Sequence, residues 1–141
     1  MLRVIPRGEG IDHVTITTLD CRAAKRFYEL ALRPLGFSVV FDWPDGGRAY
    51  LGLPAEPSSL WLVQDGGAGR VAVSLAAGDQ DAVDAFYAAA VAAGGEPVSP
   101  PAFRPEYTPY TYAAEIRDWD GNRLEAVCRR AQPAAKTERA A

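Results

Sequence analysis

Asp12-His13-Val14-Thr15-Ile16, followed by Asp20, Phe27-Tyr28 and Gly36, is the stretch that decides the fold, because the chain contains a second copy of it. The second copy reads Val71-Ala72-Val73-Ser74-Leu75, followed by Asp79, Phe86-Tyr87 and Gly95. Matched positions are separated by a constant step of 59 residues, as 72 − 13 and 95 − 36 both show. The repeat therefore predicts two similar modules, and it places His13, the only histidine of the chain, opposite Ala72.

Length and composition limit the class of protein. The chain has 141 residues, 48% of them hydrophobic, which predicts one globular domain or two small modules with a shared core. A net charge of −3 and scattered arginines argue against a nucleic-acid partner, and no apolar run is long enough to cross a membrane. The N-terminus lacks the apolar stretch of a signal peptide, and Cys21 and Cys128 form no disulfide framework. We expect a cytoplasmic protein with two reduced thiols.

The first half of the chain has the pattern of one strand, one helix and three further strands. Residues 11–18 alternate and are rich in β-branched side chains, which favours a strand. Asp20 is a suitable helix N-cap, and apolar residues then recur at helical spacing until Pro34 and Gly36. The three further strands are expected at 37–43, 48–53 and 59–64, with the turn residues Asp45-Gly46-Gly47 between the first two.

The second half repeats this order. A strand at 70–77 precedes a helix at 80–93, for which Asp79 is the expected cap. A short strand at 96–99 is expected to end where Pro100-Pro101 begins an irregular loop. The last two strands are expected at 111–117 and 122–129, around the turn residues Asp118-Trp119-Asp120-Gly121-Asn122.

These elements predict an α+β fold of two tandem βαβββ modules. A single module would leave an apolar sheet face and open edges, so we expect the modules to form one curved mixed sheet, with helices outside and a central cleft as the ligand site. The expected parts are an N-terminal extension at 1–10, the first module at 11–65, a linker at 66–69, the second module at 70–130 and a disordered tail at 131–141.

Three motifs carry a resemblance to a known family. They are Asp12-His13-Val14 in the first strand, Phe27-Tyr28 in the first helix, and Asp118-Trp119-Asp120-Gly121-Asn122-Arg123-Leu124-Glu125 near the end. In this order, and with the repeat, they resemble the vicinal oxygen chelate superfamily, which includes glyoxalase I, extradiol dioxygenases and bleomycin-resistance proteins. The last motif is similar to the family ending D-P-D-G-N-x-x-E, with Trp119 at the usual proline.

The resemblance implies four metal-ligand positions, two in each module, that hold a divalent ion against vicinal oxygens of the substrate. In this sequence they correspond to His13, Trp61, Ala72 and Glu125, and only His13 and Glu125 can ligate. A shifted register does not replace Ala72, since Arg70 has no lone pair to donate and Ser74 is a poor ligand. Glu106 or Glu115 could supply a further carboxylate.

Two ligands are few, because catalytic zinc usually takes three protein ligands, although Mg²⁺ can be held by one or two carboxylates. The cofactor expectation is therefore either a weakly held Fe, Mn, Ni, Zn or Mg ion, or none. Without a metal, His13 and Glu125 could act as a general base and its orienting carboxylate.

Several residues are candidates for ligand binding. The proline-rich segment 100–112 carries Arg104, Glu106, Tyr107 and Tyr110, which suit a lid or wall for an aromatic ligand, or a rigid surface loop. Trp61 would add an apolar wall to the cleft, whereas Trp43 and Trp119 are interpreted as packing residues. Arg70 could pair with Glu125, bind a carboxylate or phosphate of a ligand, or lie in solvent.

Two functions are compatible with these residues. The first is a glyoxalase- or dioxygenase-like protein, a lyase, isomerase or dioxygenase acting on a small oxygenated metabolite through a degraded metal site. The second is a non-catalytic protein of the bleomycin-resistance type that sequesters a planar or cationic small molecule. The exposed sheet edges and the resemblance both favour a homodimer, with the cleft closed within one chain or across the two-fold axis.

Overall fold

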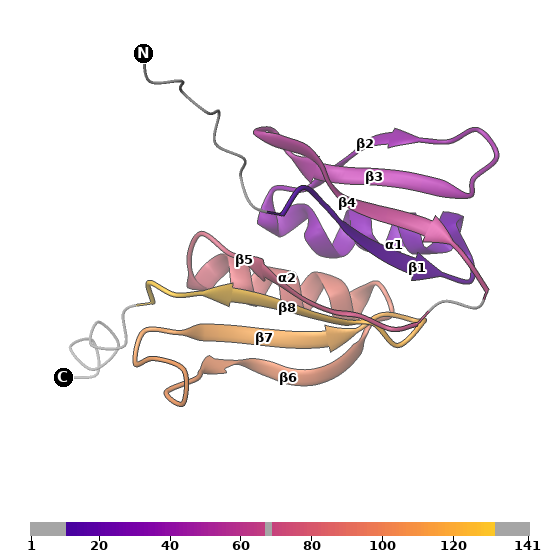
Figure 1. Cartoon of the computed structure of the whole chain (residues 1–141). Coiled ribbons are helices and arrows are strands. Elements are labelled where there is room, and N and C mark those ends of the chain that lie inside the picture. The colour runs from indigo at the N-terminus through magenta and orange to yellow at the C-terminus, as the bar shows by residue number, and fades with distance from the viewer. Residues whose placement is uncertain (1–10, 67–68, 132–141) are drawn as a thin grey trace, which may run out of the picture.

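The computed structural model describes residues 11–66 and 69–131 (Figure 1). The expected N-terminal extension, the centre of the linker and all but the first residue of the expected tail lie outside these ranges. The first module contains β1 (Val14–Thr18), α1 (Cys21–Leu32), the 3-10 helix η1 (Arg33–Leu35), β2 (Ser38–Asp42), β3 (Arg48–Leu53) and β4 (Glu56–Gln64). The second contains β5 (Ala72–Ala76), α2 (Gln80–Ala92), β6 (Glu96–Phe103), β7 (Tyr112–Arg117) and β8 (Arg123–Cys128).

Both long helices begin at the aspartates expected from the sequence. Asp20 Oδ1 accepts the backbone N–H of Ala23 at 3.1 Å, and Asp79 Oδ1 accepts that of Ala82 at 2.8 Å. Each carboxylate thereby satisfies a backbone donor that the first turn of a helix leaves unpaired. No helix in residues 11–66 and 69–131 combines the length and the apolar character of a membrane span.

The strands form two four-stranded sheets of identical topology, β1-β4-β3-β2 and β5-β8-β7-β6, which confirms the α+β class and the tandem modules. Each sheet contains one parallel pair, β1 with β4 and β5 with β8. Thr15 lies opposite Trp61, and Ser74 lies opposite Glu125. Since Thr15 and Ser74 are separated by the step of 59 residues, Trp61 and Glu125 occupy equivalent positions in the two modules.

The modules are joined through their helices. The buried faces are Ala24, Phe27, Tyr28, Ala31 and Leu32 on α1, and Val83, Phe86 and Ala90 on α2. The helices pack against each other and against their own sheets, so one hydrophobic core serves both modules (Figure 1). The eight strands therefore form two sheets rather than one curved sheet, and the helices meet at the junction instead of lying outside. In this arrangement each helix buries apolar side chains against its own sheet and against the other helix.

Three strand boundaries differ from the expected ones by three residues or more. β1 begins at Val14 rather than at residue 11, and β4 begins at Glu56 rather than at 59. β6 runs through Pro100-Pro101 to Phe103, although a break was expected at the prolines. β6 is an edge strand, where a residue without an N–H is tolerated, and its pairing with β7 shifts register between Ser99 and Ala102.

The repeated glycines Gly36 and Gly95 serve different purposes. Gly36 has φ +89°, a left-handed conformation that favours glycine at the end of a helix. At Gly95 the constraint is space, because an added Cβ would lie 2.9 Å from the Ala90 carbonyl oxygen and 3.2 Å from the Phe27 ring. Gly95 thus lets the Phe27 ring of α1 approach the start of β6, where the two modules meet.

Replacing Gly95 with alanine should lower the free energy of unfolding by about 1–3 kcal/mol, since a backbone oxygen and a buried ring must both move. Urea denaturation would measure the change. Gly78→Ala is the matched control, because nothing lies within 4 Å of a Cβ at that position. Equal stability of the two variants would show that the Ala90 carbonyl oxygen and the Phe27 ring do not lie as close to Gly95 as the structure places them.

Candidate functional site

Five aromatic side chains form a continuous row on the first sheet, here called the aromatic row: Phe41, Trp43, Tyr50, Trp61 and His13. Ring centroids are 4.5 Å apart between Phe41 and Trp43, 4.7 Å between Trp43 and Tyr50, 4.5 Å between Tyr50 and Trp61, and 3.4 Å between Trp61 and His13. The guanidinium of Arg48 lies 5.4 Å from the Trp43 ring centroid. The row thus joins rings from β2, the turn after it, β3, β4 and the segment before β1.

Strand alternation determines which face carries the row. Ala49, Leu51, Leu60 and Leu62 are buried towards α1, so the neighbouring side chains of β3 and β4 point to the opposite face. Tyr50 lies opposite Phe41 in one direction and Trp61 in the other, and cross-strand partners share a face. The aromatic row therefore lies on the face of the first sheet opposite α1.

His13 is held at the end of the row. Its imidazole is stacked on Trp61 with an angle of 8° between the planes, and its Nδ1 lies 2.8 Å from Asp12 Oδ1. The side chain retains 29% exposure, so the ring is accessible from one side. Both His13 and Trp61 were expected at the site from the sequence, and the structure brings them into direct contact.

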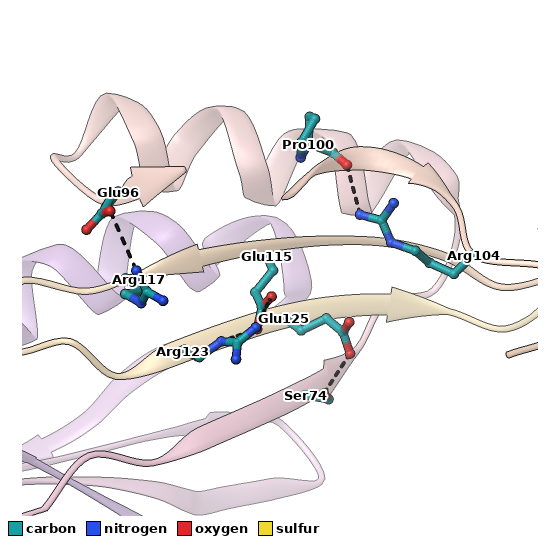
Figure 2. Close-up of polar contacts among 8 residues, drawn as sticks. All are labelled: Ser74, Glu96, Pro100, Arg104, Glu115, Arg117, Arg123 and Glu125. Atoms are coloured by element: carbon teal, nitrogen blue, oxygen red, sulfur yellow. Dashed lines mark hydrogen bonds and ion pairs between the residues drawn. The ribbon is translucent and has the colours of Figure 1, made fainter. Parts of the chain in front are cut away.

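Glu125 lies on the open face of the second sheet, where the neighbouring side chains are polar. Its Oε1 accepts the hydroxyl of Ser74 at 2.7 Å. Glu115 lies opposite Glu125 on β7 and is bound by Arg123 through two hydrogen bonds of 2.8 Å, Nε to Oε1 and Nη2 to Oε2 (Figure 2). An ion pair between Arg70 and Glu125 was one expectation, but Arg70 lies instead against Gly121.

The residues expected to form a lid lie in the loop between β6 and β7 of the second sheet, whereas the aromatic row lies on the first sheet. Arg104 Nη2 donates to the Pro100 carbonyl at 3.1 Å, so this side chain braces its own loop (Figure 2). Tyr107 and Tyr110 are 65% and 56% exposed, and Glu106 is exposed as well. The Thr108 and Thr111 hydroxyls hydrogen-bond at 2.8 Å, which closes the loop on itself.

The side chains of one chain do not fit a metal ion at the positions that the repeat defines. His13 and Glu125 lie on different sheets, each with its own polar partner, and Trp61 and Ala72 cannot ligate. Among residues 11–66 and 69–131, no three His, Cys, Asp or Glu side chains gather as a set of ligands. No chemical step through a metal is therefore derived from this chain.

The two thiols are buried and unpaired with each other. Burial, reinforced by the charge of Asp20, raises the pKa of the Cys21 thiol. A raised pKa lowers the fraction of nucleophilic thiolate at neutral pH, which favours the interpretation of Cys21 as a packing residue.

The members of the aromatic row that sequence reasoning missed are Phe41, Trp43 and Tyr50. Trp43 was interpreted as a packing residue, but it contacts both Phe41 and Tyr50 within the row. The available signal was the hairpin at Asp45-Gly46-Gly47, since pairing β2 with β3 around that turn places aromatic residues of both strands on one face.

The fold and these motifs agree with the result of comparing the sequence with models of known protein families. The model of the Glyoxalase/Bleomycin resistance protein/Dioxygenase superfamily matches residues 10–126. The chain belongs to this superfamily. No curated protein sequence matches the chain.

Solved structures show the same architecture. A glyoxalase/bleomycin resistance protein from Albidiferax ferrireducens T118 has 29% identity and a TM-score of 0.72, over 83% of this chain and 97% of that chain. A glyoxalase I mutant from Zea mays has 25% identity and a TM-score of 0.62, over 83% of this chain and 46% of that chain. TioX from Micromonospora sp. ML1 has 20% identity and a TM-score of 0.62, over 82% of this chain and 95% of that chain. The last likeness concerns the fold alone.

Proposed function

We propose that this protein binds a small planar molecule by stacking it on the aromatic row, and that it acts by sequestration rather than by metal chelation. The observation that carries the proposal is the contact between His13 and Trp61. The imidazole that would hold a metal is stacked at 3.4 Å on the indole that replaces a second ligand. The Trp61 indole is also stacked on Tyr50, so this position is built from aromatic rings rather than from metal ligands.

The chemistry of the row favours planar ligands with positive charge. The faces of indole and phenol rings attract cations, and stacking on an aromatic side chain contributes about 1–3 kcal/mol in comparable sites for nucleobases. The chain as a whole carries a net charge of −3, which favours the approach of cations. A planar heteroaromatic cation combines both properties.

The proposal includes a homodimer. The aromatic row and Glu125 lie on two different sheets whose open faces no helix covers. A second copy that laid its second sheet over the first sheet of this chain would enclose the row and would bring Glu125 of the partner subunit towards it. A closed two-fold assembly would form two such sites. We place the dimer in the cytoplasm, where Cys21 and Cys128 would remain reduced.

Titration with proflavine, a planar cation, tests the proposal through quenching of tryptophan fluorescence and through light scattering of the same samples. We expect a dimer that binds the dye, and a Kd about 10-fold higher or more for Trp61→Leu, since the row then loses the ring between Tyr50 and His13. Trp119→Leu is the matched control, because its indole is 60% exposed and lies outside the row. Equal affinities of both variants would contradict the proposal.

A second function is favoured by one contact, the 2.8 Å approach of His13 Nδ1 to Asp12. A carboxylate in this position fixes the orientation and the tautomer of an imidazole that acts as a base. An enzyme that acts on a small oxygenated metabolite would then use His13 as general base, with or without a divalent metal shared with Glu125 of the partner subunit. Turnover that is lost in His13→Gln, with binding retained, would identify this function instead of sequestration.

A further inference from the structure

The open face of the second sheet carries a hollow of about 630 Å³, next to Glu125 but not lined by it. Three arginines, Arg70, Arg117 and Arg123, line it, together with one acidic residue, Glu96. Its remaining lining is small or apolar: Val71, Ala72 and Gly121. The hollow thus has cationic walls and little side-chain bulk at its floor.

The pairing register explains why these residues meet. Ala72 lies opposite Arg123, Arg123 opposite Arg117, and Arg117 opposite Glu96, so one row crosses all four strands. Cross-strand partners share a face of the sheet, and the row therefore brings two guanidinium groups beside the methyl group of Ala72. A longer side chain at position 72, such as the ligand that the repeat would place there, would fill this space.

Arg70 reaches the hollow because Gly121 has no side chain. A Cβ added at Gly121 would lie 2.7 Å from Arg70 Nε, and the φ of +88° at this turn already favours glycine. The exposed Arg70 side chain therefore lies over the turn between β7 and β8, at the end of the hollow.

The three guanidinium groups differ in how firmly they are already bound. Arg123 is held by Glu115 through two short hydrogen bonds, whereas Arg117 Nη1 and Glu96 Oε1 are 3.6 Å apart, with side chains 42% and 67% exposed (Figure 2). Arg70 makes no ion pair within the described part of the chain. Arg70 and Arg117 thus have guanidinium N–H groups that can donate to a ligand. The Arg123 guanidinium is held in place by Glu115.

We propose that this hollow is an oxyanion site, which binds the carboxylate or phosphate group of a small molecule through Arg70 and Arg117, with Arg123 as a third, fixed cation. Guanidinium groups bind both kinds of oxyanion through paired hydrogen bonds. Glu96 swings into solvent when the anion arrives, since it is exposed and only loosely paired. Within one chain, the residues that line the hollow include no member of the aromatic row, which lies on the other sheet.

Titrations with inorganic phosphate and with malonate, at constant ionic strength in chloride, test the proposal. The readouts are isothermal calorimetry and the NMR signals of the arginine Nε–H groups. We expect binding of at least one anion with movement of the Arg70 and Arg117 signals, and a Kd at least about 5-fold higher in Arg70→Gln and in Arg117→Gln. Tighter binding of phosphate would indicate a phosphate-bearing ligand, and tighter binding of malonate a carboxylate.

The matched control is Arg26→Gln, which removes the same charge from an exposed position on α1. Ala72→Glu is a second variant, which fills the hollow with a carboxylate and should abolish binding. Trp61→Leu should bind both anions like the wild type, so failure of the stacking proposal is distinguishable from failure of this one. Binding of neither anion, or equal weakening by Arg26→Gln and Arg70→Gln, would overturn the proposal.

Discussion

Replacing Asp118 with alanine should lower the free energy of unfolding by about 3–5 kcal/mol, because this carboxylate is the buried acceptor of a network at the junction of the modules. Its Oδ2 accepts the Tyr28 hydroxyl at 2.5 Å and the Asn122 side-chain amide at 2.9 Å. Its Oδ1 accepts the backbone N–H groups of Asp120 at 3.0 Å and Asn122 at 2.8 Å. Alanine would leave several of these buried donors without a partner.

The loss would extend beyond the turn, since the residues that Asp118 positions bind the first strand of each module or the residue beside it. Asn122 Oδ1 accepts the Val71 N–H at 2.9 Å, and its Nδ2 donates to the Thr17 carbonyl at 3.3 Å. Asp120 accepts the Thr18 hydroxyl at 2.6 Å and the Leu19 N–H at 2.9 Å. The Asp-Trp-Asp-Gly-Asn motif thereby fastens the end of β1 to the start of β5.

Urea denaturation followed by circular dichroism would measure this effect. Asp45→Ala is the matched control, because Asp45 is an exposed turn aspartate that accepts one backbone N–H, that of Gly47 at 2.8 Å. We expect the control to lose less than about 1 kcal/mol. Similar losses in both variants would show that the network does not hold the modules together.

The order of elements could be predicted from the sequence because its signals are local. Asp20 and Asp79 cap their helices through bonds to residues three positions along the chain. The extension of β6 through Pro100-Pro101 could not be predicted in this way. A proline is tolerated there only because β6 is the edge strand, and the strand order is a property of the whole sheet.

The candidate site was only partly predictable for the same reason. The resemblance placed His13 and Trp61 at the two ligand positions of the first module, and their proximity follows from the parallel pairing of β1 with β4. The meeting of α1 with α2 depends on long-range packing, which no local pattern encodes, and it leaves His13 and Glu125 on separate sheets. The motif at Asp118 was recognised, but its role as a fastening between modules required the positions of Tyr28 and Thr18.

Alkaline pH should lower the stability of the protein, because two tyrosines are held in their neutral form. Burial, and then the charge of Asp118, raise the pKa of Tyr28 well above 10. Burial, and then the hydrogen bond to Asp84, raise the pKa of Tyr112 to about 12. In the unfolded chain both phenols ionise near pH 10, so between about pH 10 and 12 the unfolded state binds fewer protons than the folded state.

The free energy of unfolding therefore falls as pH rises above about 10. Where both phenols are ionised in the unfolded chain and neutral in the folded protein, unfolding releases about two protons per molecule. Cys21 acts in the same direction from about pH 9, since its pKa is raised as well. Urea midpoints between about pH 8 and 12 would measure the slope, and Tyr112→Phe should remove about one proton from it above pH 10. A midpoint that stays constant over this range would mean that Tyr28 and Tyr112 ionise as readily in the folded protein as in the unfolded chain. The contacts of Tyr28 with Asp118 and of Tyr112 with Asp84 would then not be maintained in solution.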